Sequence, residues 1–275
     1  MSDRNTATTR RDAALLMADR DRVQRRIESL ARFTDPDRPF TRLAFGDLYL
    51  AARDWLAGEF AAAGMKVSVD EAGNLVGRVN GAVPDLPALA SGSHFDTVPG
   101  GGKYDGILGI VAALEVASVL KDAGIMLKHP LRIAGFIGEE TTEYGVSGVG
   151  SRAWAGTLTS SLLAAPRPDG ETLAEGIARM GGKPSELENV LVTRGEIAAY
   201  VELHIEQGPM LESRGVPIGV VEGIVASQRR GLKIMGEARH AGTTPMKLRK
   251  DALAGAAEVV LLVEHLAREY AADEQ

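Results

Sequence analysis

His94 and Asp96 are the first pair of residues along this chain whose types and spacing suit metal chemistry. A histidine at a strand end, with an aspartate two residues later, can place both side chains on one side of the chain. The carboxylate could then accept the second imidazole N–H and fix its tautomer, as outer partners of metal-bound histidines do. The alternative is an exposed loop histidine with a helix-capping aspartate, which is the more common situation for an isolated His-x-Asp pair.

A glycine-rich loop over residues 100–106 contains Asp105 and precedes an apolar segment at 107–121. Glycine lets the backbone approach a ligand closely. A phosphate-binding loop is a rival interpretation, but a tyrosine follows the lysine where that motif requires Ser or Thr. Asp105 could simply cap the next helix. Beside His94 it could instead bridge two cations, because a carboxylate has two oxygens.

Two adjacent carboxylates, Glu139 and Glu140, follow an apolar segment at 131–137 that is typical of a buried strand. Neighbouring carboxylates repel one another unless a cation or a proton lies between them. One could therefore bind a metal while the other acts as a general base. A solvated acidic turn is an equally good interpretation, and Glu143 is better explained as such a turn residue.

Residues 200–206 alternate strictly between apolar and polar side chains and predict a strand with Glu202, His204 and Glu206 on one face. A strand in a sheet covered on both sides should be apolar on both faces. Burying these three groups would require partners or a metal ion. If the strand lies at a sheet edge, the polar face only meets solvent; of the two, we favour the site.

The remaining histidines are less informative. His240 lies in the segment Arg-His-Ala-Gly-Thr-Thr-Pro-Met at 239–246 and could donate a hydrogen bond to a developing oxyanion, although a polar turn is the plain alternative. His129 precedes a proline, and His265 lies on the helix expected at 251–270. We interpret both as structural or exposed.

The elements that must position these residues alternate between helices and strands, which favours an α/β fold: a mixed sheet flanked by helices. Asp19 and Asp47 are the expected helix N-caps, and residues 166–185 read as a long surface excursion. Ligands bind beyond the carboxyl ends of strands in such sheets, where His94, Glu139 and His204 are expected. Helices are expected at 20–30, 48–63, 107–121 and 251–270, and strands at 65–69, 75–79, 87–93, 131–137, 200–206, 218–225 and 232–235.

Composition narrows the class of protein. The 275 residues allow one large or two ordinary domains, and 25% charged with 45% hydrophobic residues is typical of a globular protein. The formal net charge of −6 argues against a nucleic-acid partner. The absence of cysteine excludes disulfides and thiolate metal sites, so a metal site must use His, Asp and Glu. Residues 1–14 carry no apolar signal-peptide core, and no apolar run could cross a membrane, so we expect a cytoplasmic protein.

Taken together, six motifs from about residue 41 onward resemble the hydantoinase/carbamoylase branch of the M20 metallopeptidase-like amidohydrolases. That branch contains N-carbamoyl-L-amino acid hydrolases, β-ureidopropionases and allantoate amidohydrolases. The resemblance implies a zinc-exopeptidase-like catalytic domain at 1–214, part of an α+β lid and dimerisation domain at 215–275, and a homodimer. The motifs are residues 92–99, 101–106, 139–140, 150–153, 202–209 and 240–246.

The resemblance also implies a two-metal hydrolase, with Zn²⁺ expected first and Mn²⁺ or Co²⁺ as alternatives. His94, Asp105 and His204 would hold one metal, and Asp105 would bridge to a second metal held by Glu140.

Further roles follow from the same resemblance. Glu139 would be the general base, and Asp96 would orient His94. Gln207 would contact the substrate. His240 would polarise the scissile carbonyl across the dimer interface.

Two departures from the family pattern limit this expectation. Family members are longer, and their further segment supplies the second metal's remaining His and substrate-binding Asn and Arg residues. An inactive, truncated chain that binds metal is therefore the alternative to an N-carbamoyl-L-amino acid amidohydrolase. Residues 141–144 read Thr-Thr-Glu-Tyr where a small residue, Arg and Phe are typical, so allantoate, N-acyl amino acid or peptide substrates stay open.

Overall fold

The structure is a computed structural model that describes residues 16–224 and 230–273. It comprises two compact units, one ending at Met210 and the other beginning at Leu211. The expected absence of a signal peptide concerns residues 1–14, which lie outside the described residues. Each unit is described by itself below.

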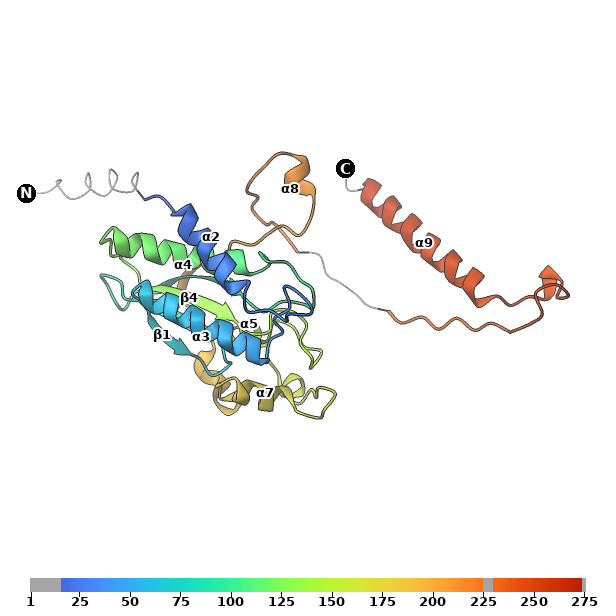
Figure 1. The fold of residues 1–275 in the computed structure, drawn as a ribbon, viewed down its shortest axis with the longest axis horizontal. Coiled ribbons are helices and arrows are strands. Elements are labelled where there is room, and N and C mark those ends of the chain that lie inside the picture. Colours follow the sequence, from blue (N-terminus) through green and yellow to red (C-terminus); the bar gives the residue numbers. More distant parts are fainter. Residues whose placement is uncertain (1–15, 225–229, 274–275) are drawn as a thin grey trace, which may run out of the picture. The chain divides into compact units, whose positions relative to one another are not determined.

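The first unit is built on a five-stranded mixed sheet with the strand order β1-β2-β4-β3-β5, and Figure 1 shows helices packed around this sheet. β2 pairs antiparallel with β1 and β4, whereas β3 runs parallel to both β4 and β5. This arrangement confirms the predicted fold class of a mixed sheet flanked by helices. The strands are β1 (Lys66–Val69), β2 (Leu75–Val79), β3 (Ala88–His94), β4 (Leu131–Phe136) and β5 (Ile197–Val201).

Helices pack on both faces of this sheet. The Asp19 side chain accepts a hydrogen bond from Arg22 N at 2.9 Å and caps the first helix, as predicted. Asp47 is the first helical residue rather than the cap, a position that Gly46 takes. The helices are α2 (Arg20–Leu30), α3 (Asp47–Ala62), α4 (Ile107–Asp122), α5 (Val149–Trp154), α6 (Ser160–Leu163) and α7 (Leu173–Arg179), followed by a 3₁₀ helix, η2 (Pro184–Val190).

The core lies in two layers because successive strand residues point to opposite faces of the sheet. Leu75 and Ile133 join the larger cluster, which contains the buried side of α3 and α4. Their neighbours Val76 and Ala134 join a smaller cluster with Trp154 of α5. The central strands are therefore covered on both faces, and their carboxyl ends are left to form a site.

The segment at 166–185 is not the surface excursion that we predicted from its proline, glycine and charge. It contains α7, whose N-terminus has a capping box between Thr172 and Glu175. Leu173, Ile177 and Met180 share one helical face and are fully buried in the main core. The polar residues of this segment lie on the opposite face of α7 and in the turns. They outnumber the few apolar residues of the buried face, so the helix is hard to detect in the sequence.

The strand predicted at 200–206 is also shorter than expected. β5 ends at Val201, which pairs with Ser91 of β3, so Glu202, His204 and Glu206 follow the strand instead of forming one of its faces. A Cβ on Gly109 of α4 would lie 2.2 Å from Leu203 O, because the chain leaves the sheet and passes closely over this helix. The alternating pattern is therefore a property of an irregular segment at the edge of the described sheet.

The second unit contains less regular structure than predicted. Its helices are α8 (Met210–Ser213), η3 (Met246–Leu248) and α9 (Ala252–Asp273), of which α9 confirms the predicted terminal helix. Neither 218–224 nor 232–235 forms a strand, and residue 225 lies outside the described residues. A strand needs a hydrogen-bonded neighbour, and the described residues of this unit supply none. None of the helices within 16–224 and 230–273 is long and apolar enough to cross a bilayer.

Candidate metal centre

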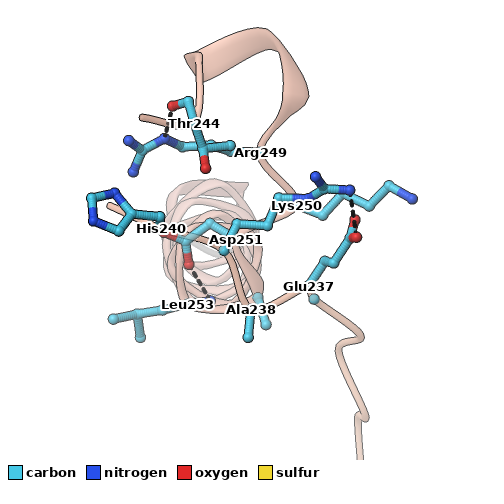
Figure 2. A pocket seen from close by; sticks show the side chains of 11 residues that line it. Glu237, Ala238, His240, Thr244, Arg249, Lys250, Asp251 and Leu253 are labelled. Carbon is cyan, nitrogen blue, oxygen red and sulfur yellow. Dashed lines mark hydrogen bonds and ion pairs between the residues drawn. The ribbon is translucent and has the colours of Figure 1, made fainter. Parts of the chain in front are cut away.

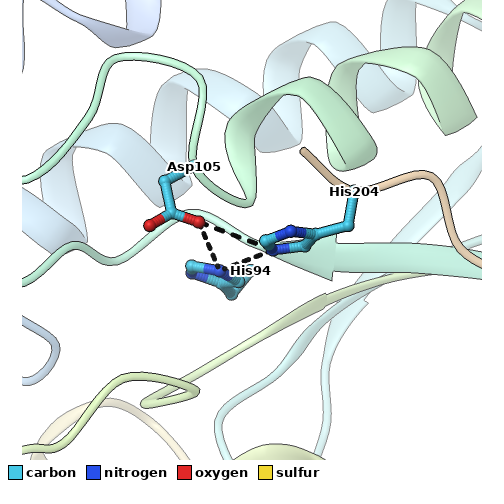
Figure 3. Close-up of side chains that lie close together, drawn as sticks. All are labelled: His94, Asp105 and His204. Atoms are coloured by element: carbon cyan, nitrogen blue, oxygen red, sulfur yellow. Dashed lines mark hydrogen bonds and ion pairs between the residues drawn. The ribbon is translucent and has the colours of Figure 1, made fainter. Parts of the chain in front are cut away.

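His94, Asp105 and His204 lie together at the carboxyl end of the sheet (Figure 3). His94 is the last residue of β3, Asp105 precedes α4, and His204 follows β5. Asp105 Oδ1 is 3.7 Å from His94 Nε2 and 3.5 Å from His204 Nε2. One donor atom from each residue lies within 4.8 Å of the other two, so this group could hold a metal ion.

Both histidines direct Nε2 toward Asp105 because Nδ1 is engaged elsewhere. His94 Nδ1 lies 3.0 Å from the backbone O of Asp96, and His204 Nδ1 lies 2.9 Å from Ile205 O. A carbonyl can only accept, so in each neutral ring Nδ1 carries the proton and Nε2 is left with a lone pair. This is the tautomer that a metal ligand needs.

Asp96 contacts both His94 and the acidic loop that follows β4. Its Oδ1 is 3.6 Å from His94 Nδ1, and its Oδ2 accepts a hydrogen bond from Glu140 N at 3.2 Å. The closest polar contact from Asp96 to His94 is thus its backbone oxygen, and the carboxylate that we expected to orient the ring lies slightly farther away. Burial by itself lowers the pKa of His94, but Asp96 and then Glu139 outweigh it and raise that pKa to about 9.

The donor set fits a divalent cation. Within the described part of the chain, Asp105 Oδ1 is buried and has no hydrogen-bond partner, which is costly for a carboxylate oxygen unless a cation is bound. Gly106 has a φ of +65°, and a Cβ there would lie 2.5 Å from the His94 ring, so only glycine permits this approach. Two imidazole nitrogens and one carboxylate oxygen are ligands of Zn²⁺, and Mn²⁺ or Co²⁺ also accept them.

The two predicted glutamates take different positions near this group. Glu139 Oε2 lies 3.7 Å from His94 Nε2, and about half of the Glu139 side chain is exposed. Partial burial raises the pKa of Glu139, and the nearby histidines oppose that shift. Burial, followed by the charge of Glu139, also raises the pKa of Glu140. Among the described residues, Glu140 is not part of the three-residue group, and its role as a second ligand stays a prediction.

Gln207 lies beside the group in a strained conformation. Its Nε2 donates to Asp105 Oδ2 at 2.7 Å, which leaves Oδ1 as the oxygen that faces the histidines. Its φ of 56° is in the left-handed region, which is rare for a residue other than glycine. Such strain at a site is often part of how it works.

His240 belongs to the second unit and lines a cavity of about 440 Å³ there (Figure 2). Its Nδ1 accepts hydrogen bonds from Gly242 N at 3.1 Å and Thr243 N at 3.2 Å. The neutral ring must therefore carry its proton on Nε2, which becomes an outward donor. Arg249 braces the same turn because its guanidinium donates to the carbonyl oxygens of Thr244 and Ala241.

Comparison with known proteins agrees with this chemistry. The family model described as Peptidase family M20/M25/M40 matches residues 90–274. The chain belongs to this family. An N-carbamoyl-L-amino-acid amidohydrolase of Paenarthrobacter aurescens is 38% identical to this M20 protein over 258 residues, covering 94% of the chain and 63% of that enzyme. A ureidoglycolate hydrolase of Arabidopsis thaliana is 39% identical over 259 residues, covering 92% and 54%.

A solved structure extends the likeness of this M20 chain to its fold. A hydantoinase/carbamoylase family amidase from Burkholderia ambifaria superposes with a TM-score of 0.77 at 36% identity, covering 94% of this chain and 63% of that one. The predicted resemblance to the hydantoinase/carbamoylase branch of the M20 family is thereby confirmed. The chain spans between about half and two thirds of the length of these relatives.

Two buried residues near the site of this M20 chain were not singled out from the sequence. Asn74 Oδ1 accepts from Ile137 N at 3.0 Å, and its Nδ2 donates to Gly150 O at 3.3 Å, so one amide closes both ends of the loop that carries the glutamates. The sequence shows only a Gly-Asn turn there. Arg42 is the second residue, and its one signal is a charged side chain directly before an apolar run.

Proposed function

We propose that the protein containing this chain is a metal-dependent amidohydrolase that cleaves a carbamoyl or ureido C–N bond of a small molecule. N-carbamoyl-L-amino acids are the first choice of substrate. The observation that carries this proposal is the convergence of His94, Asp105 and His204, with Glu139 Oε2 at 3.7 Å from His94 Nε2. Metal ligands with an adjacent carboxylate are a combination that can hydrolyse an unactivated C–N bond.

When bound by His94, Asp105 and His204, a divalent cation would supply Lewis acidity, which lowers the pKa of a nearby water and favours negative charge on a reacting oxygen. Glu139 then acts as general base: it takes a proton from the attacking water and delivers it to the leaving nitrogen. Its raised pKa supports this role, because a carboxylate whose pKa lies closer to the working pH is a stronger base toward the attacking water.

We extend the proposal to a second metal, with Asp105 as the bridge and Glu140 as a ligand. Zn²⁺ is the first choice, and Mn²⁺ or Co²⁺ are the alternatives. Glu140 N donates to Asp96 Oδ2, and the backbone O of Asp96 contacts His94 Nδ1, so Asp96 links the two residues that would hold the metals.

Substrate contacts are proposed for two side chains. His240 would donate from Nε2 to the oxygen of the scissile carbonyl, a role supported by the hydrogen bonds that occupy its Nδ1. Gln207 would offer its amide to the ureido or carboxylate end of the substrate. In keeping with these roles, we propose a catalytic domain over 1–214, a partial lid over 215–275, a homodimer in which His240 reaches the neighbouring site, and a cytoplasmic location.

The relatives support the substrate class and leave a second candidate within it. Similarity to an N-carbamoyl-L-amino-acid amidohydrolase favours the first substrate, and similarity to a ureidoglycolate hydrolase favours a small ureido acid, such as ureidoglycolate or allantoate. N-acyl amino acids or peptides are the third choice. A chain that binds metal without turnover is the alternative of another class.

The test measures ammonia release from N-carbamoyl-L-amino acids, allantoate and ureidoglycolate, and acid release from N-acyl amino acids, with Zn²⁺, Mn²⁺ or Co²⁺ present. Glu139→Gln should lower kcat by about 10²–10⁴-fold while the metal content stays the same. Glu186→Gln is the matched control, because Glu186 lies on η2 and forms an exposed ion pair with Lys183 at 3.4 Å. Equal turnover by Glu139→Gln and the unaltered protein would refute the proposed role of Glu139, and metal binding with no turnover on any substrate would favour the inactive chain.

A further inference from the structure

Arg42 is a buried cation whose guanidinium is surrounded by backbone carbonyls. Only 2% of the residue is exposed. Its Nε donates to Phe95 O at 2.6 Å, and its Nη1 donates to Leu30 O at 2.8 Å and Phe33 O at 2.9 Å. Arg42 therefore joins the end of α2 to the residue that directly follows His94.

The backbone of Arg42 holds the same loop at a second point. Arg42 N donates to Thr97 Oγ1 at 2.8 Å, and Thr97 N donates to Arg42 O at 2.9 Å. Thr97 Oγ1 in turn donates to Phe40 O at 2.9 Å. The residues on either side of Asp96 are thus both bound to Arg42, one through its side chain and one through its backbone.

Asp96 is the acidic residue between Phe95 and Thr97, the two residues that Arg42 binds. It is 1% exposed, and among the described residues its Oδ1 and the Nη2 of Arg42 are both buried without a hydrogen-bond partner. Burial lowers the pKa of Arg42 to about 10, and the charge of Asp96 opposes that shift, so the guanidinium is still charged at neutral pH. A buried carboxylate without a cation nearby would be strongly disfavoured.

Asp96 contacts both His94 and Glu140. Its backbone O contacts His94 Nδ1, and its Oδ2 accepts from Glu140 N. A shift of the backbone at 95–97 would therefore turn the His94 ring and move the loop that carries Glu140. A displacement of about 1 Å is large for a site that must hold its groups within about 0.5 Å.

We propose that Arg42 is a positioning residue for the metal centre, acting through Phe95, Thr97 and Asp96 on His94. The proposal deepens the proposed function and rests on its metal site, but not on its reaction or substrate. The competing explanation is that Arg42 only anchors the end of α2. That explanation predicts a loss of stability with no change in the metal affinity of the folded protein.

The test is a Co²⁺ titration of the 275-residue chain, followed by the visible absorption of the bound ion and by competition with a chelator. Arg42→Met, which keeps the length but removes the charge and the donors, should raise the Kd for Co²⁺ by about 10–100-fold, as is typical of an outer partner of a ligand. Arg42→Lys should recover part of the affinity because it keeps the charge. Thr97→Val removes the hydroxyl that accepts from Arg42 N, with little change in shape, and should also raise the Kd for Co²⁺.

Arg132→Met is the matched control. Arg132 is also a buried arginine, but it lies opposite Ala90 in the pairing of β4 with β3, and its guanidinium stacks on Trp154 at 3.8 Å. It should lower stability and leave the Co²⁺ affinity and spectrum unchanged. If Arg42→Met does not fold, Thr97→Val and Arg42→Lys decide the question.

Unchanged Co²⁺ affinity and spectrum in the folded Arg42 and Thr97 variants would overturn the proposal, as would an equal loss in Arg132→Met. Failure of the unaltered chain to bind Co²⁺ would overturn both this proposal and the proposed metal site. Weaker Co²⁺ binding by the Arg42 variants, together with no hydrolysis of any substrate, would support the role of Arg42 while refuting the proposed function.

Discussion

The Nε2 atoms of His94 and His204 lie 3.4 Å apart, although 110 residues separate them along the chain. β3 and β5 are parallel neighbours, so the chain that leaves each strand emerges at the same edge of the sheet. In the neutral rings both nitrogens direct lone pairs toward Asp105, because their Nδ1 atoms donate to carbonyls. Two lone pairs at this distance repel unless a proton or a metal ion lies between them.

Replacing His204 should abolish tight metal binding. His204→Asn removes one of the three converging donor atoms, and we expect the Kd for Zn²⁺ to rise by more than about 100-fold, beyond the range typical of an outer partner. Metal content and chelator competition measure this. His129→Asn is the control, because His129 Nδ1 contacts Pro87 O at 2.7 Å away from the site, and its Zn²⁺ affinity should not change. Equal affinities in the two variants would contradict the assignment of His204.

Asn74 should contribute strongly to stability through its single side-chain amide. Asn74→Ala leaves Ile137 N and Gly150 O buried without this partner, and each such loss costs about 1–3 kcal/mol of unfolding free energy. Urea unfolding at neutral pH measures the difference. Asn80→Ala, at an exposed position, should change stability by less than about 0.5 kcal/mol. A similarly small effect at Asn74 would show that the loop closes without the amide.

Glu171 should make stability depend on pH below about 4.5. It accepts hydrogen bonds from Arg179 Nε at 2.8 Å and from Tyr144 OH at 2.6 Å. The Arg179 guanidinium holds the pKa of Glu171 down to about 2, below its ordinary value of 4.5. Because the folded pKa is the lower one, the stabilisation is complete above 4.5 and is lost as the pH falls toward 2.

Glu171→Gln should therefore lower the unfolding free energy at pH 7 by about 1–3 kcal/mol, and the gap to the unaltered protein should narrow at pH 3. Urea unfolding at the two pH values measures both quantities. Glu186→Gln is the control. Glu186 Oε2 lies 3.4 Å from Nζ of Lys183, whose side chain is mostly exposed, so this substitution should have little effect on stability at either pH. A gap for Glu171→Gln that is the same at both pH values would rule out the charged contact as its cause.

Two substitutions of His240 can distinguish the role of Nδ1 as an acceptor from the proposed role of Nε2 as a donor. His240→Asn keeps an acceptor for the backbone of Gly242 and Thr243 but removes the Nε2 donor, so kcat on the proposed substrate should fall by about 10²–10³-fold. His240→Gln places an amide nitrogen near the position of Nε2 and should retain more activity. Helix content by circular dichroism should stay constant, and His265→Gln on the exposed face of α9 is the control. Full turnover by His240→Asn would exclude the donor role.

The elements around the site were predictable where an apolar run ends at a glycine or a polar turn. α4 was expected at 107–121 and spans Ile107–Asp122, and β3 was expected at 87–93 and spans Ala88–His94. The strand predicted at 200–206 was too long, because alternating apolar and polar residues do not show whether a neighbouring strand is present to pair with. The same holds for 218–224, where the apolar residues have no described strand to pair with.

The candidate ligands could be predicted because metal-binding side chains are few in a chain without cysteine. The residues that hold them could not be predicted in the same way. Arg42 reaches Phe95 across 53 residues, and Asn74 reaches Ile137 across 63 residues. Each of these hydrogen bonds joins a side chain to a backbone atom, so the residue type of the partner does not indicate the bond. Only the fold brings such pairs together.

Anomalous diffraction from crystals grown with Zn²⁺ tests the central claim most directly. We expect an anomalous peak at about 2.0–2.2 Å from His94 Nε2, from His204 Nε2 and from an oxygen of Asp105, since these are the distances at which Zn²⁺ binds such ligands. A protein with no peak among these three residues, or with its zinc held by other side chains, would contradict the assignment of the metal centre.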